Sequence, residues 1–283
     1  MTLCIASLCD HGNGMAICFD REIQTDIAKA QTGFKLVVLP SRWQALQAGS
    51  LHRTKELTDL YKEHLGTIDV SSMEESAVLE QLRIPPAKLR RRMAETLTQT
   101  KFSVGYEDFL RSGKDWFDLD THRQTLYEIS SQNFEGDELI LFGAASGEFL
   151  LYKFSGGEVW QCRDFAVIGS GTTVAEPILY QRKQDWTKSV QETLYSLYEA
   201  KKLAEVTPGV GDKTLVAMQF LSKPGRLQWL SARGLEILEH EFSTFGPKPY
   251  VAAEPQYGLD VYLDPDVFGQ VVETVSNSSI VQT

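Results

Sequence analysis

The chain opens with the stretch TLCIASLCDHGNGMAICFDR, residues 2–21. Its apolar runs at 3–8 and 15–19 predict two β-strands, because each has strand length and β-forming residues. Residues 10–14 between them combine Asp, Asn and two glycines, which is strong turn chemistry. The stretch therefore predicts an antiparallel hairpin, with Thr2 opening its first strand and Asp20 ending its second.

The rest of the chain continues this alternation of strand and helix patterns. Further strands are predicted at 34–39, 43–48, 138–144, 149–154, 165–168, 214–220, 227–231 and 235–242. Helices are predicted after Ser50 and at 87–100, 120–130, 173–183 and 189–203, with Pro85 and Pro86 at the start of the second. Blocks of strands separated by pairs of helices predict an α+β fold, a four-layer αββα sandwich of two antiparallel sheets.

Length and composition limit the classes of protein to consider. The chain has 283 residues, a net charge of -10 and a pI near 5.1, which disfavours a nucleic-acid-binding protein. It shows neither a signal peptide nor an apolar run of membrane-spanning length, so we expect a soluble cytoplasmic protein without membrane contact. We expect a single domain over residues 1–250, with a helical insertion around 72–137, and a partly disordered C-terminal extension over 251–283.

The cysteines and histidines predict neither a metal site nor a cofactor. The four cysteines form no Cys-x-x-Cys pair, and none of the five histidines has metal-ligand or triad spacing. Cys4 and Cys18 lie within apolar runs and are predicted to be small buried hydrophobic residues, as suits a reducing compartment.

Thr2 is the candidate nucleophile. Methionine aminopeptidase removes an initiator methionine that precedes a small residue, and the sequence shows no pro-segment before Thr2. Thr2 would then carry both a hydroxyl and a free α-amine, which titrates near pH 8 and can act as the base for that hydroxyl. Many chains begin Met-Thr, so this prediction depends on the residues around Thr2.

Asp20 and Lys35 supply that context. A lysine ammonium beside the nucleophile would lower the pKa of the threonine amine and hydroxyl, and an aspartate would orient the lysine. Taken singly, Asp20 also fits a turn residue, and Lys35 also fits a charge at a strand edge.

Five features in this order resemble the proteasome β-subunits and their bacterial relatives, including the Anbu group. They are Thr2, Asp20-Arg21, Phe34-Lys35-Leu36, Ala48-Gly49 before a helix, and Gly169-Ser170-Gly171 before another. The loop from Gly209 to Thr214 also resembles the last active-site loop of that family. The resemblance covers residues 2–72 and 138–240 and implies an N-terminal-nucleophile (Ntn) hydrolase fold.

The resemblance also implies a role for each residue. Thr2 would be the nucleophile, Lys35 would tune its amine, and Asp20 would orient Lys35. The N–H of Gly49 would stabilise the oxyanion. Ser170 and Asp212 would support the terminal amine, and Gln47 and Leu51 would line the substrate pocket.

The implied activity is that of a threonine peptidase in a homo-oligomer, such as a ring or a stacked assembly, with peptides or unfolded proteins as substrates. An ATP-dependent unfoldase is a further partner that the resemblance allows. Two alternatives remain open at this point: a catalytically silent structural subunit, and an Ntn amidase acting on small amides. By itself, the Gly-Ser-Gly segment also fits a plain strand-to-helix turn or a phosphate-binding turn.

Overall fold

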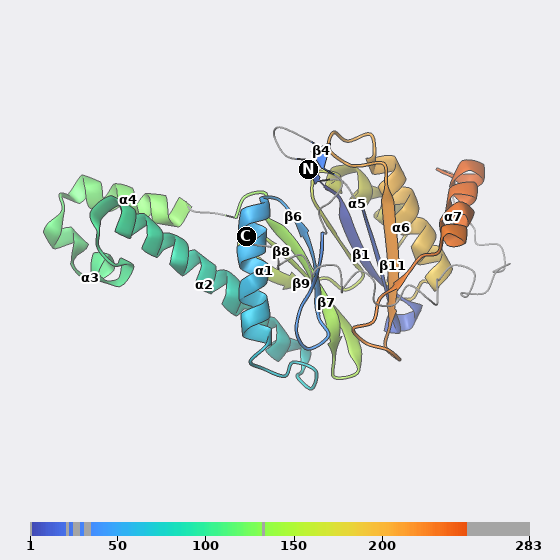
Figure 1. The fold of residues 1–283 in the computed structure, drawn as a ribbon, viewed down its shortest axis with the longest axis horizontal. Helices are drawn as coiled ribbons and strands as arrows, with labels where there is room; N and C mark the ends of the chain where they lie inside the picture. Colours follow the sequence, from blue (N-terminus) through green and yellow to red (C-terminus); the bar gives the residue numbers. More distant parts are fainter. Residues whose placement is uncertain (1, 21–22, 25–28, 31–34, 132–133, 248–283) are drawn as a thin grey trace, which may run out of the picture.

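Two five-stranded antiparallel sheets form the centre of the computed structural model (Figure 1). It describes residues 2–20, 23–24, 29–30, 35–131 and 134–247. The predictions for Arg21, for Phe34 and for the extension 251–283 fall outside these residues. The prediction of an α+β fold with antiparallel sheets is confirmed.

The first sheet contains the hairpin predicted from the opening stretch. Its strands are, in spatial order, β10 (Phe165–Ile168), β1 (Cys4–Cys9), β2 (Gly14–Asp20), β11 (Thr214–Phe220) and β12 (Gln228–Trp229). A short 3-10 turn, Asp10–Gly12, joins β1 to β2, and Cys4 pairs with Phe19 at the other end of the hairpin. The start of β1 therefore lies beside the end of β2, which brings Thr2 close to Asp20.

The second sheet is built from the middle of the chain. Its spatial order is β5 (Leu36–Val38), β6 (Gln44–Ala48), β7 (Glu138–Ala145), β8 (Glu148–Ser155) and β9 (Glu158–Gln161). A separate two-stranded ladder joins β3 (Ile23–Gln24) to β4 (Lys29–Ala30).

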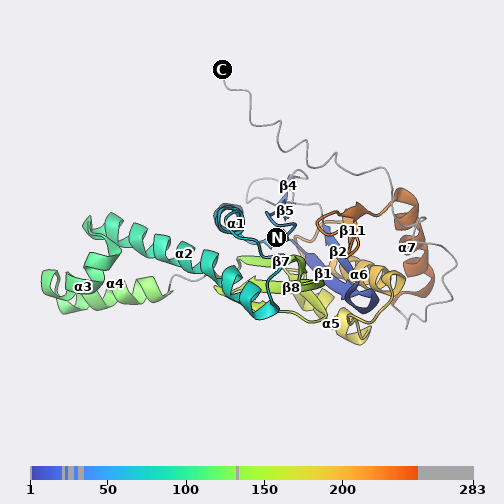
Figure 2. The ribbon, with the colours of Figure 1, turned by 90° about the horizontal axis from the view of Figure 1, so that it is seen from below.

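The described residues contain seven α-helices. They are α1 (Leu51–Leu65), α2 (Glu75–Phe102), α3 (Tyr106–Trp116), α4 (Leu119–Ser131), α5 (Thr172–Gln181), α6 (Val190–Ala204) and α7 (Ala232–Phe245). Figures 1 and 2 show α5, α6 and α7 beside the first sheet, and α1 beside the second.

Alternation along the strands gives each sheet two apolar faces. On β1, Ile5 faces a hydrophobic cluster shared with α5, α6 and α7, whereas Cys4 and Ala6 face a cluster shared with β6, β7 and β8. A third cluster joins the opposite face of the second sheet to α1 and α2. The two sheets thus pack on each other through one face and on helices through the other.

Helix α2 differs from its prediction. Pro85 and Pro86 do not begin a helix, because α2 starts at Glu75 and runs through both prolines. A proline at position 86 cannot donate to the carbonyl of Leu82. The buried hydroxyl of Tyr61 donates to that carbonyl at 2.8 Å instead, so the helix continues with its acceptor satisfied.

The predicted strand at 235–242 is also wrong, since these residues form most of α7. Leu235, Leu238 and Phe242 recur at helical spacing and pack on the first-sheet cluster. Ser231 accepts the N–H of Gly234 at 2.9 Å and caps the helix. The predictions missed α3 altogether.

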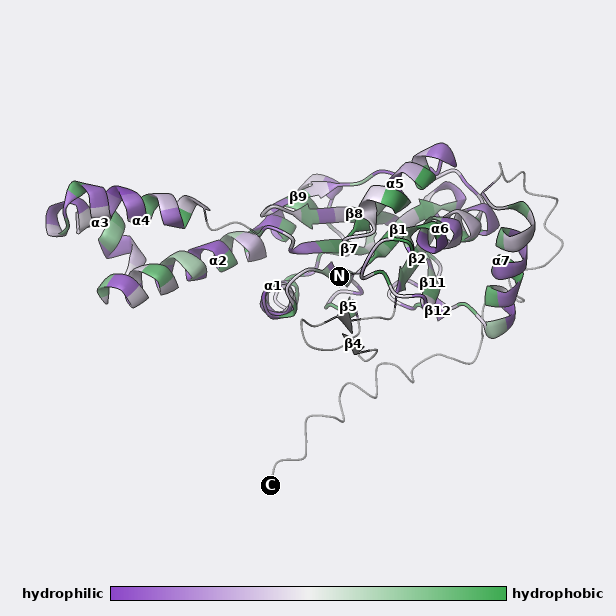
Figure 3. Cartoon of the chain, turned by 90° about the horizontal axis from the view of Figure 1, so that it is seen from above, coloured by the Kyte–Doolittle hydropathy of each residue, from purple (hydrophilic) through white to green (hydrophobic). Residues whose placement is uncertain are grey.

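Helices α2, α3 and α4 lie between β6 and β7 in the chain and extend away from the sheets as an arm (Figure 1). Hydrophilic residues cover much of α3 and α4, whereas β1 and β2 are rich in hydrophobic residues (Figure 3). The rings of Phe102, Phe109 and Phe117 pack on one another where α2 meets α3. Within the described part of the chain, no helix is long and apolar enough to span a membrane.

Candidate active site

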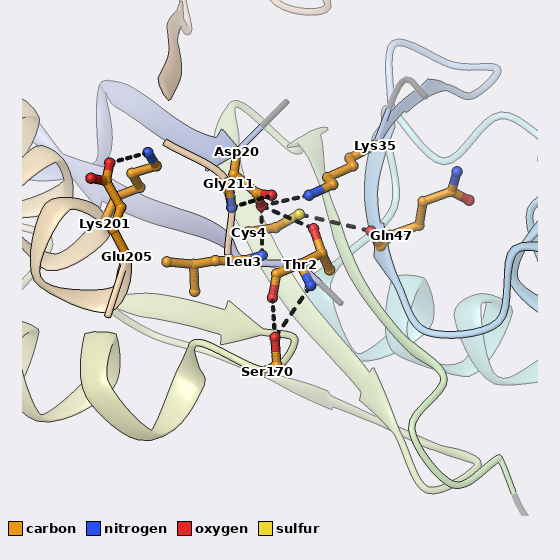
Figure 4. Close-up of polar contacts among 10 residues, drawn as sticks. All are labelled: Thr2, Leu3, Cys4, Asp20, Lys35, Gln47, Ser170, Lys201, Glu205 and Gly211. Atoms are coloured by element: carbon orange, nitrogen blue, oxygen red, sulfur yellow. Dashed lines mark hydrogen bonds and ion pairs between the residues drawn. The ribbon is translucent and has the colours of Figure 1, made fainter. Parts of the chain in front are cut away.

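Thr2 lies just before β1, against the turn that joins β10 to α5. Its backbone N–H donates to Ser170 Oγ at 3.3 Å, and Ser170 Oγ donates back to the carbonyl of Thr2 at 3.3 Å (Figure 4). The Thr2 residue is only 6% exposed. Two reciprocal hydrogen bonds therefore fix the backbone of Thr2 to a segment 168 residues away in the sequence.

Asp20, at the end of β2, is the central acceptor of the site. One carboxylate oxygen, Oδ1, accepts the hydroxyl of Thr2 at 3.0 Å and the N–H of Leu3 at 2.7 Å. The other, Oδ2, accepts the N–H of Gly211 at 3.2 Å. Asp20 is fully buried, so these bonds compensate for the removal of a carboxylate from water.

Lys35 brings a cation from the second sheet to the same carboxylate. Its Nζ lies 2.5 Å from Asp20 Oδ1, and the two side chains are 4% and 0% exposed. Lys35 is held just before β5 because its carbonyl accepts the N–H of Gln47 at 2.9 Å. The ammonium of Lys35 and the hydroxyl of Thr2 thus contact one shared oxygen.

Cys4 is a neighbour that the sequence analysis did not place in the site. Its Sγ lies 3.8 Å from the carbonyl oxygen of Gln47. Burial raises the pKa of this thiol to about 12, although the nearby Lys35 acts in the opposite direction. Cys4 therefore stays neutral at physiological pH and adds no negative charge beside Asp20.

Two glycines of the predicted site allow close backbone approaches, Gly169 to Thr2 and Gly49 to Gly136. Gly169 has φ +95°, and a Cβ there would lie 2.2 Å from the carbonyl oxygen of Thr2. Gly49 has φ +110°, and a Cβ there would lie 2.1 Å from the carbonyl oxygen of Gly136. Any other residue at either position would be strained in backbone and would clash.

The remaining predicted residues lie farther from this cluster. Asp212 is exposed, and its loop contributes the N–H of the preceding Gly211 to Asp20. The side chain of Gln47 points away from Thr2 in Figure 4. Leu51 begins α1 and is 57% exposed. The structure thus brings together Thr2, Asp20, Lys35 and Ser170, and does not bring the Asp212 or Gln47 side chain to Thr2.

The sequence analysis identified the loop from Gly209 to Thr214 but assigned its role to Asp212. The contact comes instead from the N–H of Gly211, a backbone group with no side-chain signature. Across the described ranges, no group of three or more His, Cys, Asp or Glu side chains could hold a metal ion.

Comparison with known proteins gives a structural match alone. No protein-family model and no curated protein matches the chain. Among solved structures, it is similar to "Anbu (Gly-1) mutant" from Hyphomicrobium sp. strain MC1, with a TM-score of 0.56 and 14% identity. The match covers 89% of this chain and 100% of that one. This chain therefore has a fold similar to that of Anbu. Anbu belongs to the group of proteins that the sequence motifs of this chain resemble.

Proposed function

We propose that this chain is an N-terminal threonine hydrolase, a proteasome-like peptidase that forms an acyl-enzyme on Thr2. The observation that carries the proposal is the shared oxygen of Asp20, which contacts both the hydroxyl of Thr2 and the ammonium of Lys35. The fold similarity to Anbu supports the same proposal. We assign the fold to the four-layer αββα Ntn sandwich, in agreement with its three hydrophobic clusters.

The mechanism requires processing that leaves Thr2 as the first residue. The free α-amine then takes the proton of Thr2 Oγ1 as that oxygen attacks the substrate carbonyl. Lys35 lowers the pKa of the amine through its positive charge, so that more of the amine is unprotonated at neutral pH. Asp20 holds Lys35 and the Thr2 hydroxyl in place.

The tetrahedral intermediate carries its negative charge on the former carbonyl oxygen, which the N–H of Gly49 would stabilise. Collapse of the intermediate expels the amine of the leaving fragment, which receives the proton from the Thr2 ammonium. Water then attacks the ester, the α-amine accepts its proton, and Thr2 Oγ1 regains a proton as the acid product leaves.

The substitution Thr2→Ala tests the proposal directly. It removes the nucleophile and keeps a small residue after the initiator methionine, so we expect loss of hydrolysis of fluorogenic peptides with an unchanged unfolding midpoint. Thr2→Ser is the matched control, because it keeps a hydroxyl and an amine and should retain measurable turnover.

The same assays separate the alternatives. Hydrolysis of small amides without cleavage of peptides would favour an Ntn amidase. Absence of both activities in a chain whose Thr2 amine is free would contradict the proposal and favour a structural subunit.

A further inference from the structure

Two consecutive carboxylates, Asp137 and Glu138, connect the loops around the candidate site. Glu138 begins β7 and pairs with Ala48, the last residue of β6. Asp137 therefore lies beside Gly49, in the segment just before the strand. Because successive residues of an extended chain point to opposite sides, the two side chains reach different loops.

Asp137 holds the loop of Gly49. Its Oδ1 accepts the N–H of Ser50 at 2.8 Å, and its Oδ2 lies 3.2 Å from Arg53 Nε. The side chain of Ser50 makes no capping bond to α1, so Asp137 caps that helix from a distant part of the chain. Asp137 is only 2% exposed, and it fixes the peptide that follows Gly49.

Glu138 holds the turn that binds Thr2. Its Oε2 accepts the N–H of Gly169 at 2.7 Å, and its Oε1 lies 3.4 Å from Lys153 Nζ on β8. Lys153 in turn donates to the carbonyl of Val167 at 2.8 Å. The end of β10 is therefore attached to the second sheet on both sides of Ile168, directly before Ser170.

We propose that Asp137 and Glu138 are positioning residues. They hold two segments at a fixed separation: the loop of Gly49, which would supply the oxyanion donor, and the turn of Gly169 and Ser170, which binds Thr2. Asp137 acts through Ser50 on Gly49, and Glu138 acts through Gly169 on Ser170 and Thr2. Neither carboxylate touches the reacting atoms. This inference rests on the proposed function, since the separation of the two loops determines whether the hydroxyl and the oxyanion donor reach one carbonyl.

The substitutions Asp137→Asn and Glu138→Gln remove the charges with little change of size, and Asp137→Ala and Glu138→Ala remove the acceptors. Glu148→Gln is the control, because Glu148 is exposed at the start of the neighbouring strand β8. Misplacement of reacting groups by about 1 Å can cost about 100-fold in rate. We expect kcat for a fluorogenic peptide to fall by about 10- to 100-fold in the alanine variants, with KM nearly unchanged.

Hydrogen–deuterium exchange supplies a readout that does not depend on activity. Glu138→Ala should speed exchange at 169–171 and at Leu3, whereas Asp137→Ala should speed exchange at 49–53. The glutamine variant should show a smaller change than the alanine variant, because its amide oxygen can still accept the N–H of Gly169.

Exchange and kcat indistinguishable from those of Glu148→Gln would overturn the inference. A fall in activity that matches the unfolded fraction, measured by circular dichroism, would also overturn it. If the parent protein neither cleaves peptides nor labels at Thr2, the proposed function fails and so does the catalytic part of this inference. The exchange data then decide by themselves whether the two carboxylates hold these loops.

Discussion

Asp20 illustrates how much of the site depends on one buried carboxylate. It accepts from Thr2, Leu3 and Gly211 and pairs with Lys35, so three separate segments meet at its two oxygens. Without those donors, a buried carboxylate would be strongly destabilising. The same contacts that favour the proposed chemistry therefore also stabilise the start of the chain.

Lys35→Met should lower the free energy of unfolding by about 3–5 kcal/mol, because it leaves the buried charge of Asp20 unpaired. The double variant Lys35→Met with Asp20→Asn should recover part of that loss. Guanidinium denaturation measures both effects, with the exposed Lys55→Met as the control. A loss in Lys35→Met no larger than that of the control would show that the pair contributes nothing to stability.

At this scale the sequence predicted four residues that meet in the structure: Thr2, Asp20, Lys35 and Ser170. Each has a side chain whose chemistry could be recognised in advance. The roles of Asp137 and Glu138 could not be predicted, because their carboxylate oxygens accept backbone N–H groups of residues distant in the sequence. Only the folded chain shows which backbone groups lie within reach.

At the scale of elements, the strands of the hairpin were predictable from their apolar runs. Successive side chains point to opposite faces, and each face packs into its own apolar cluster. Helix α2 was not, because the rule that proline begins a helix ignores a distant hydroxyl that satisfies the freed carbonyl. Helix α7 was mistaken for a strand because its short apolar run also fits strand length. Tertiary contacts decided both cases.

Tyr61→Phe should destabilise the protein by about 1–3 kcal/mol, since it leaves the buried carbonyl of Leu82 without a donor. In a Pro86→Ala background the same substitution should cost less, because the N–H of residue 86 can then bond to that carbonyl. Urea denaturation of the four proteins of this double-mutant cycle measures the difference. Equal costs in the two backgrounds would refute the link between Tyr61 and Pro86.

At the scale of the whole molecule, the stacking of two sheets and their helices buries the thiols of β1 and β2. Burial raises the pKa of Cys4, Cys9 and Cys18 to about 12 and that of the half-buried Cys162 to about 11, from an ordinary value of 9.0. These thiols stay protonated in the folded state at pH values where the unfolded chain ionises.

The folded state therefore binds more protons than the unfolded state between pH 9 and about 12. The stability that depends on this difference is fully present below pH 9 and is lost as the pH rises further. We expect the urea midpoint to fall above pH 9, and iodoacetamide at pH 8 to label Cys4, Cys9 and Cys18 only after denaturation. Rapid labelling of these cysteines in the native protein would contradict their burial.

The arm formed by α2, α3 and α4 was predicted in part, since helices were expected at 87–100 and 120–130 but not over α3. Its helices lie between β6 and β7 in the chain. The helical insertion around 72–137 and the single domain over 1–250 stay predictions. The first half of α2 packs on the second sheet through Val78 and Leu82. Leu110, Trp116 and Tyr127 are exposed on the arm. The homo-oligomer stays a prediction.

Mass spectrometry of the purified protein before and after incubation with a peptide epoxyketone shows whether Thr2 is the nucleophile. This reagent needs both the amine and the hydroxyl of an N-terminal threonine to form its stable adduct. We expect a mature chain that begins at Thr2 and gains one adduct, which fragmentation assigns to Thr2 and which Thr2→Ala abolishes. A chain that keeps any residue before Thr2, or a free Thr2 that gains no adduct, would contradict the assignment of Thr2 as the nucleophile.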